Sequence, residues 1–157
     1  MKITFLFASI ALASGLLFTN AYTSLIDATS WGSNIPHSIG AAREYFKNVN
    51  PGNFFRVFSP ANQVLALLAL ILFWKAGPSV RILLGSTFVL YVICDVMTFA
   101  YFYPRNDILF RDAALTDVET LTKTWRQWNS MNWVRTLILA AGVISSFIAA
   151  HRIYTVK

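Results

Sequence analysis

Four long apolar stretches dominate the pattern of hydrophobic and polar positions along the chain. A membrane-spanning helix needs about 20 apolar residues, because its backbone must satisfy its own hydrogen bonds in hydrocarbon. The pattern predicts spanning helices over about residues 3–26, 57–75, 79–103 and 131–151, and it lacks the alternation of outer-membrane strands. We therefore expect an all-α, four-helix transmembrane bundle that forms a single integral membrane domain over residues 1–157.

The connections between these stretches are unequal. Between residues 75 and 79, Gly77 and Pro78 predict a tight turn, so the second and third helices form an antiparallel hairpin. The other two connections are long, and each is expected to contain an amphipathic helix, over about residues 39–49 and 116–129. Because four crossings return the chain to its starting side, both long connections lie on one membrane face and both termini on the other.

Composition supports a membrane environment. Of 157 residues, 56% are hydrophobic and 13% are charged, whereas a soluble domain has about a quarter charged residues. The net charge of +6 comes from scattered Lys and Arg, which fits the ends of spanning helices beside lipid headgroups and excludes a nucleic-acid partner. We expect a bacterial inner (cytoplasmic) membrane protein with cytoplasmic termini, and the oligomeric state stays open.

The N-terminal stretch also resembles a signal peptide. Lys2 precedes an apolar run, and Thr19-Asn20-Ala21 resembles a cleavage site. The run is long for a signal peptide, and its removal would leave an unpaired three-helix remnant. An uncleaved first helix is therefore the favoured interpretation.

Residues that bind metals or cofactors are scarce. Cys94 is the only cysteine, which excludes an internal disulfide, a thiol relay and a cysteine zinc site. His37 and His151 are expected on opposite membrane faces, so they cannot share a haem iron. A glycine-rich phosphate loop is also missing, and the sequence predicts neither a cofactor nor a metal.

Asp95 has the highest free-energy cost of membrane insertion among the residues of the third spanning stretch. A carboxylate at mid-membrane costs at least ~2.5 kcal/mol on insertion scales, so it must face the interior. Helical steps of three and four place it on one stripe with Thr98, Phe99, Phe102 and Asn106. The stripe fits either a structural tie between helices or a buried functional site.

A second polar stripe leads into the fourth stretch. Trp125, Trp128, Asn132 and Arg135 are spaced 3, 4 and 3, which places them on one face of a continuous helix. An interfacial aromatic belt explains the tryptophans but not an arginine inside the apolar boundary. Asp95, the only acid within the membrane, is the candidate counter-ion.

Three further segments have simpler interpretations. Gly142 and Ser146 are expected to let the fourth helix approach the first closely. Arg43 in the first connection is expected on a solvated face of an interfacial helix. Arg56 and Asn62, before and within the second stretch, are candidates for the same site mouth as Asn106 and Arg135.

The polar segments also resemble a known family. The sequence between residues 102 and 136 is similar to the DUF1772 or anthrone oxygenase-like family of small four-helix membrane proteins. Members end the third helix with Pro-x-Asn and enter the fourth with Trp followed by Trp-Asn-x-Val-Arg. The matching residues are Pro104, Asn106, Trp125, Asn132, Val134 and Arg135, whereas Met131 stands where a Trp is expected and Trp128 is its nearest substitute.

The resemblance implies an activity. Anthrone oxygenation inserts oxygen at the activated CH2 of a planar polycyclic phenol, without metal or flavin, because the deprotonated substrate donates the electrons. Such a site needs an apolar slot, a base and donors for the enolate oxygen. The implied catalytic residues are Asp95 as base, with Arg135, Asn132 and Asn106 as oxyanion donors. The implied substrate-binding residues are Phe99, Phe102, Trp125 and Trp128.

Two other classes of function remain open. A non-catalytic membrane protein that binds lipid or stabilises a partner would use Asp95 and Arg135 as a direct structural pair. An enzyme would instead place their polar tips in a shared pocket. A transporter has less support, because the chain lacks an inverted repeat and a broken helix.

Overall fold

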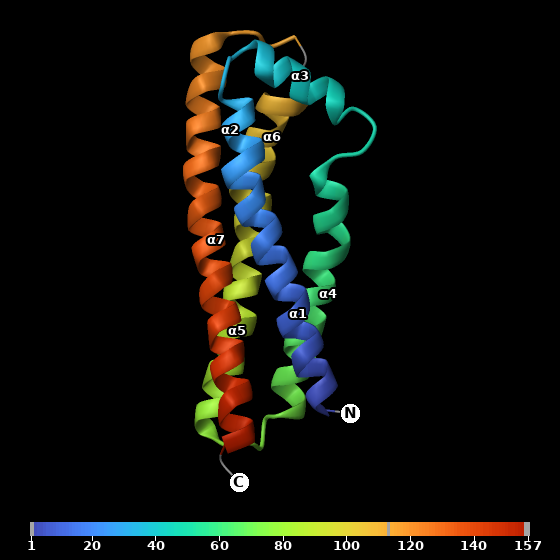
Figure 1. The fold of residues 1–157 in the computed structure, drawn as a ribbon, viewed down its shortest axis with the longest axis vertical. Coiled ribbons are helices and arrows are strands. Elements are labelled where there is room, and N and C mark those ends of the chain that lie inside the picture. Colours follow the sequence, from blue (N-terminus) through green and yellow to red (C-terminus); the bar gives the residue numbers. More distant parts are fainter. Residues whose placement is uncertain (1, 113, 156–157) are drawn as a thin grey trace.

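The computed structural model describes residues 2–112 and 114–155, and every regular element in these ranges is helical. Four helical segments are long and apolar enough to cross a membrane, and they run side by side with both chain ends at the same end of the bundle (Figure 1). The expected all-α class with four candidate spans is therefore confirmed. The four segments cover Lys2–Trp31, Pro51–Leu72, Pro78–Arg111 and Val118–Thr155.

Two of the four segments contain π-helical turns and extend beyond the ends expected near residues 26 and 103. Such wider turns are rare and occur often near functional sites. The first segment consists of α1 (Lys2–Tyr22), the π-turn η1 (Thr23–Asp27) and α2 (Ala28–Trp31). The third consists of α5 (Pro78–Met97), η2 (Thr98–Phe102), α6 (Tyr103–Asn106) and η3 (Asp107–Arg111).

The second spanning helix, α4, covers Pro51–Leu72 rather than residues 57–75. Its start is fixed by a capping box, in which the Asn50 Oδ1 accepts from the Gly52 N–H at 2.9 Å and the Asn53 side chain bonds back to Asn50. The turn into α5 passes through Gly77, whose φ of 117° is open only to glycine. The tight hairpin follows from this turn.

The fourth segment, α7, is one helix over Val118–Thr155. The amphipathic helix expected at residues 116–129 is thus not a separate element but its N-terminal part, because no Gly or Pro interrupts the chain before Gly142. With 38 residues, α7 is about 57 Å long at about 1.5 Å per residue, well beyond a hydrocarbon core of about 30 Å. Its N-terminal part therefore projects beside the long connections.

The long connections cap the end of the bundle opposite the termini (Figure 1). Helix α3 (His37–Tyr45) lies across that end. Arg43 does not lie on a solvated face as expected. Its guanidinium donates to the carbonyl oxygens of Leu109 at 2.8 Å, Leu115 at 3.0 Å and Ile108 at 3.2 Å. Because the carbonyls of Ile108 and Leu109 lie near the end of η3, a cation is favoured there, and Arg43 ties α3 to η3 and to the segment that follows it.

Gly142 and Ser146 of α7 contact α5, not the first helix as expected. A Cβ at Gly142 would lie 2.4 Å from the ring of Tyr91, so only glycine fits there. In the same contact between α5 and α7, the Thr87 Oγ1 lies 3.2 Å from the Gly142 carbonyl oxygen and 3.2 Å from the Ser146 Oγ. Small and hydroxyl residues thus allow this contact.

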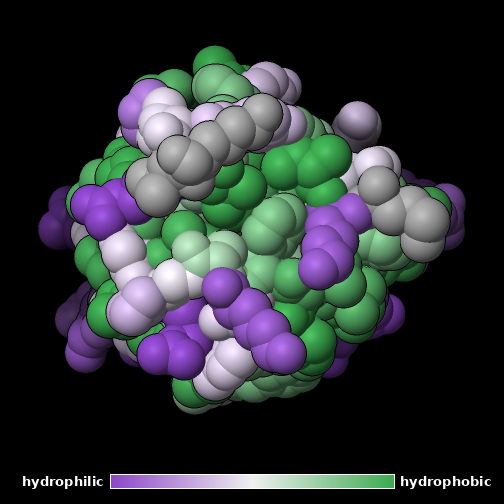
Figure 2. Space-filling view, turned by 90° about the horizontal axis from the view of Figure 1, so that it is seen from below, coloured by the Kyte–Doolittle hydropathy of each residue, from purple (hydrophilic) through white to green (hydrophobic). Residues whose placement is uncertain are grey.

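The end of the molecule that carries both termini is mixed in character. Hydrophobic residues fill most of this face, and hydrophilic side chains form separated patches around it (Figure 2). Lys75, Arg81 and Arg152 are exposed near this end, with the Arg81 guanidinium 5.1 Å from the Trp74 ring. Such basic and aromatic side chains suit a membrane–water boundary.

Candidate functional site

A large cavity of about 650 Å³ lies near the end of the bundle that carries the long connections. The N-terminal half of α4 forms one wall, and the segment from α5 to η3 forms the opposite wall. Among the predicted site residues, Asp95, Phe99, Phe102, Asn106, Trp128 and Arg135 all line it. The structure therefore brings together residues from both predicted stripes.

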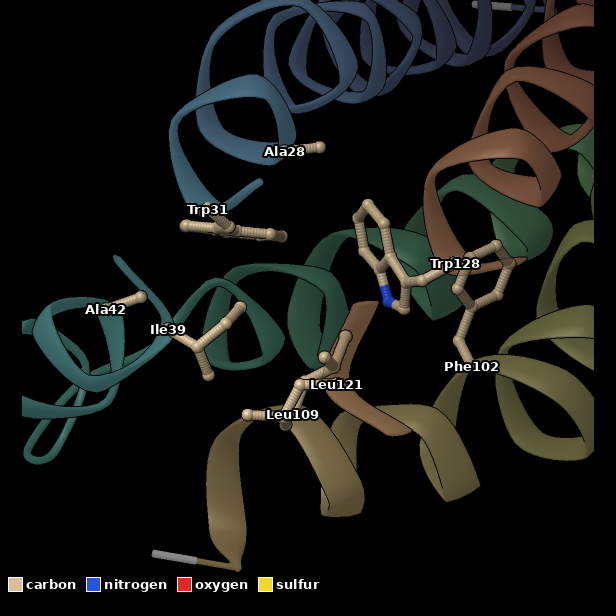
Figure 3. Close-up of a cluster of buried hydrophobic side chains, with 8 residues drawn as sticks. All are labelled: Ala28, Trp31, Ile39, Ala42, Phe102, Leu109, Leu121 and Trp128. Atoms are coloured by element: carbon tan, nitrogen blue, oxygen red, sulfur yellow. The ribbon is translucent and has the colours of Figure 1, made fainter. Parts of the chain in front are cut away.

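Aromatic rings form the inner wall of this cavity. Trp31, Phe102 and Trp128 lie edge to face, with ring centroids 5.3 Å apart for Trp31 and Trp128 and 5.5 Å for Phe102 and Trp128. These three rings belong to a buried cluster that joins α2, α3, η2, η3 and α7, as Figure 3 shows. Since this cluster includes the fully buried Leu109 and Leu121, the wall rests on a packed core.

The indole of Trp128 is fixed by a polar contact. Its Nε1–H donates to the Asn106 Oδ1 at 2.7 Å. This bond crosses from α7 to α6 and occupies the oxygen of the Asn106 amide, so the group that Asn106 can offer to a ligand is its NH2. Both residues were predicted site residues, and the structure places them in contact.

Arg135 is a buried cation with uncharged partners. One terminal nitrogen donates to the Asn132 Oδ1 at 2.5 Å and the other to the Thr98 Oγ1 at 3.3 Å. The guanidinium carbon lies 4.1 Å from the centroid of the Phe102 ring, a favourable cation–π distance. Its Nε has no hydrogen-bond partner among the described residues.

Asp95 has a different partner from the one expected. Its carboxylate accepts a hydrogen bond from the Gln63 amide of α4. Within residues 2–112 and 114–155 the ion pairs are Lys47–Glu44 and Arg111–Asp107, so Asp95 and Arg135 do not pair directly. Both side chains line the same cavity, so two groups of opposite charge face it without forming an ion pair.

Asn132 lies behind the site rather than in it. Its side chain is fully buried and does not line the large cavity. Its Nδ2 donates to the Ser24 Oγ at 2.7 Å and to the Asn20 carbonyl at 3.3 Å, while its Oδ1 accepts from Arg135. Asn132 therefore orients Arg135 and is itself held by the first helical segment.

Trp125 and Phe99 differ from the rest of the predicted aromatic set. Trp125 is not among the cavity-lining residues. Its Nε1–H donates to the Ala28 carbonyl at 2.7 Å, and its ring packs so closely on Gly32 that a Cβ there would lie 2.1 Å away. Phe99 lines the cavity but is 64% exposed, so it faces both the cavity and the outside of the bundle.

The sequence did not identify Gln63 or Phe55 as site residues, and it did not predict that Arg43 lines the large cavity. Gln63 could have been identified from the sequence. It follows Asn62 inside an apolar stretch, where a second amide side chain needs a polar partner. Phe55 gave no signal, and its ring lies 5.7 Å from the Arg135 guanidinium. Arg56 lines the large cavity as suggested, whereas Asn62 lines a smaller cavity deeper in the bundle.

Together, the four apolar helical segments and the polar cavity at one end define a candidate four-span helical membrane protein with charged residues inside its apolar segments. The family model for anthrone oxygenase matches residues 54–145, and the chain belongs to this anthrone oxygenase family, also known as DUF1772. The matched region covers α4, α5 and the part of α7 that carries Arg135, but not α1. Neither the curated proteins nor the solved structures contain a match to the chain.

Proposed function

We propose that the large cavity binds a planar, lipophilic aromatic molecule and that the protein is a cofactor-independent, anthrone oxygenase-like monooxygenase acting on it. The observation that carries this proposal is that Asp95 and Arg135 line one aromatic-walled cavity without pairing with each other. Its volume of about 650 Å³ is typical of small-molecule sites. Family membership supports the same reaction class.

The proposed reaction converts an activated CH2 and O2 into a carbonyl and water. Asp95 takes the first proton from the CH2, which leaves an electron-rich enolate. The enolate gives electrons to O2, and a carbon–oxygen bond forms to give a hydroperoxide after protonation. Loss of the second proton with cleavage of the O–O bond yields the carbonyl and hydroxide, which is protonated to water. The carbon loses four electrons and O2 gains four.

The roles of the polar residues follow from their surroundings. Arg135 stabilises the enolate oxygen, because a cation in a low-dielectric site acts more strongly on developing charge than it does in water. The Asn106 NH2 is a second donor to that oxygen, since its Oδ1 is held by Trp128. Asn132 positions the Arg135 guanidinium, and Phe102 and Trp128 stack against the planar ligand.

The test is oxygen uptake by the purified protein in phospholipid nanodiscs, with 1,8-dihydroxyanthrone as substrate and empty nanodiscs as the blank for autoxidation. We expect one O2 consumed per anthraquinone formed, with one atom of labelled O2 in the product. Arg135→Gln should lower kcat/KM by about 10²–10³-fold, the typical loss for an oxyanion donor. Arg152→Gln, at the exposed far end of the same helix, is the matched control and should retain full activity.

The alternative is a non-catalytic protein that binds lipid or stabilises a partner. It is favoured by the fact that Asp95 and Arg135 each have hydrogen-bond partners in the chain. In that case anthrone binding, measured by quenching of tryptophan fluorescence, occurs without oxygen uptake above the blank. Full turnover by Arg135→Gln would rule out the oxyanion role.

A further inference from the structure

A second, smaller cavity adjoins the large one on the side nearer the middle of the bundle. Its volume is about 30 Å³, and it shares Asp95, Thr98 and Arg135 with the large cavity. The residues that line it alone include Asn20 of α1, Asn62 of α4 and Tyr91 of α5. We call this space the polar chamber.

Four buried polar atoms of the residues lining the polar chamber have no hydrogen-bond partner among the described residues. They are the Asn20 Oδ1, the Asn62 Oδ1, the Tyr91 hydroxyl oxygen and the Arg135 Nε, in residues that are 4%, 2%, 2% and 9% exposed. The other polar groups of two of these residues are occupied: the Asn20 Nδ2 donates to the Leu16 carbonyl at 2.9 Å, and both terminal nitrogens of Arg135 are bonded. Because buried polar groups are normally satisfied, four such atoms at one small cavity indicate a ligand.

The chemistry of the four atoms defines that ligand. Two amide oxygens need donors, one N–H needs an acceptor, and the Tyr91 hydroxyl can pair with either. A bound cation is disfavoured because Arg135 is positively charged. A bound anion is disfavoured because Asp95 and the two amide oxygens repel negative charge. Dioxygen is excluded because it has no hydrogen to donate to these oxygens. Water donates twice and accepts twice, and a chamber of about 30 Å³ exceeds the roughly 10–15 Å³ that a single water needs.

We infer that the polar chamber is a binding site for ordered water. The water accepts from the Arg135 Nε–H and donates to the Asn20 and Asn62 Oδ1 atoms, so it joins α1, α4 and α7. It lies beside Asp95 at the base of the large cavity. This inference does not rest on the proposed function, since the site is occupied whether or not the protein turns over a substrate.

Hydroxyl-radical footprinting by X-ray radiolysis tests the inference, because radicals formed from a bound water modify the nearest side chains. Tyr91 is the reporter: it is 2% exposed and lines the polar chamber but not the large cavity. Leu84, also 2% exposed and lining neither cavity, is the dry reference. Corrected for intrinsic reactivity, Tyr91 should be modified several-fold faster than Leu84 in the full-length protein in nanodiscs.

Two matched variants make the test specific. Asn62→Leu removes an acceptor and fills the chamber, so Tyr91 modification should fall to the Leu84 level. Asn129→Leu makes the same change at a residue whose Oδ1 is also unpartnered but which lines neither cavity, and it should leave Tyr91 modification unchanged. If Asn62→Leu does not fold, Asn20→Leu replaces it.

Two results overturn the inference. One is Tyr91 modification no faster than that of Leu84, or unaffected by Asn62→Leu. The other is a high-resolution density map that shows ordered waters elsewhere but none within hydrogen-bonding distance of the Arg135 Nε and the two amide oxygens. A density peak that bridges these atoms supports it.

Discussion

Arg135 can lie buried on α7 because its neighbours accept its hydrogen bonds, although none of them carries a negative charge. Asn132 and Thr98 accept from its terminal nitrogens, and the Phe102 ring lies against its guanidinium. All three partners are uncharged, so the positive charge persists in a low-dielectric site. An anionic ligand group therefore gains more from this residue than it would from an arginine already paired with a carboxylate.

At the residue scale, Asp95→Asn tests the proposed base. Asparagine keeps an oxygen that can accept from Gln63, so the fold should persist, but it cannot take the CH2 proton. We expect kcat with 1,8-dihydroxyanthrone to fall by about 10²–10⁴-fold while ligand binding changes little. Steady-state oxygen uptake and fluorescence quenching measure the two effects.

Glu119→Gln is the matched control, because Glu119 is an exposed acid in the first turn of α7, outside both cavities. It should retain full turnover. An Asp95→Asn protein with wild-type kcat would remove Asp95 from the proposed chemistry.

The sequence was sufficient to mark Asp95 and Arg135 as interior residues, because charge is costly within an apolar stretch. It was not sufficient to predict their partners. Gln63, the partner of Asp95, comes from α4, and Thr98, a partner of Arg135, comes from η2, so both contacts depend on how the helices pack across the whole bundle. For the same reason, Trp125 shares a helical face with Trp128 but packs on Gly32 rather than lining the cavity.

At the scale of elements, the contact between α5 and α7 depends on Gly142. Gly142→Ala places a methyl group 2.4 Å from the ring of Tyr91, which is itself buried, so the ring or the helices must shift. We expect a loss of stability of about 1–3 kcal/mol, typical of overpacking. Equilibrium unfolding in mixed micelles measures it.

Gly85→Ala in α5 is the control for this substitution. A Cβ at Gly85 meets nothing within 4 Å, so alanine should stabilise the helix by up to about 1 kcal/mol. Equal stability of the Gly142→Ala protein and the wild type would contradict the close contact between α5 and α7.

The N-terminus of α7 has a pH-dependent cap. The Asp117 Oδ2 accepts from the Thr120 N–H at 2.8 Å, and hydrogen bonds from Thr120 lower the pKa of this exposed carboxyl below 3.8. The charged form is favoured in the folded state, so its contribution to stability is present above the ordinary pKa and is lost as the pH falls through the lowered value.

We therefore expect Asp117→Asn to show a smaller drop in stability on acidification below pH about 4 than the wild type, because asparagine can cap without a charge. Hydrogen exchange at the first turn of α7, followed across this range, measures the effect. Identical acid profiles for both proteins would contradict the assignment of Asp117 as the cap.

Hydropathy predicted the number of spanning helices but not where each helix ends. It located four candidate spans, because a bilayer requires long apolar helices. It misplaced their ends, since α4 starts at its Asn50 cap and α7 continues through a polar segment that lacks a helix breaker. Helix ends depend on caps and breakers, which lie outside the apolar runs.

At the scale of the whole molecule, the even number of crossings correctly predicted that the long connections cap the end opposite the termini. The cavity lies at this capped end, where Arg43 ties α3 to η3. Its depth was not predictable from the sequence, because it depends on how the N-terminal half of α4 packs against the other helices.

The exposed position of Phe99 has a kinetic consequence. Phe99 lines the large cavity and is also 64% exposed on the outside of the bundle, where acyl chains surround the protein. Under the proposed function, we expect a lipophilic ligand to enter sideways from the bilayer, so that the concentration governing its capture is its mole fraction in lipid. Diluting a fixed, sub-saturating amount of substrate with empty phospholipid should slow turnover in proportion, and a rate that stays constant would contradict capture of a lipid-dissolved substrate.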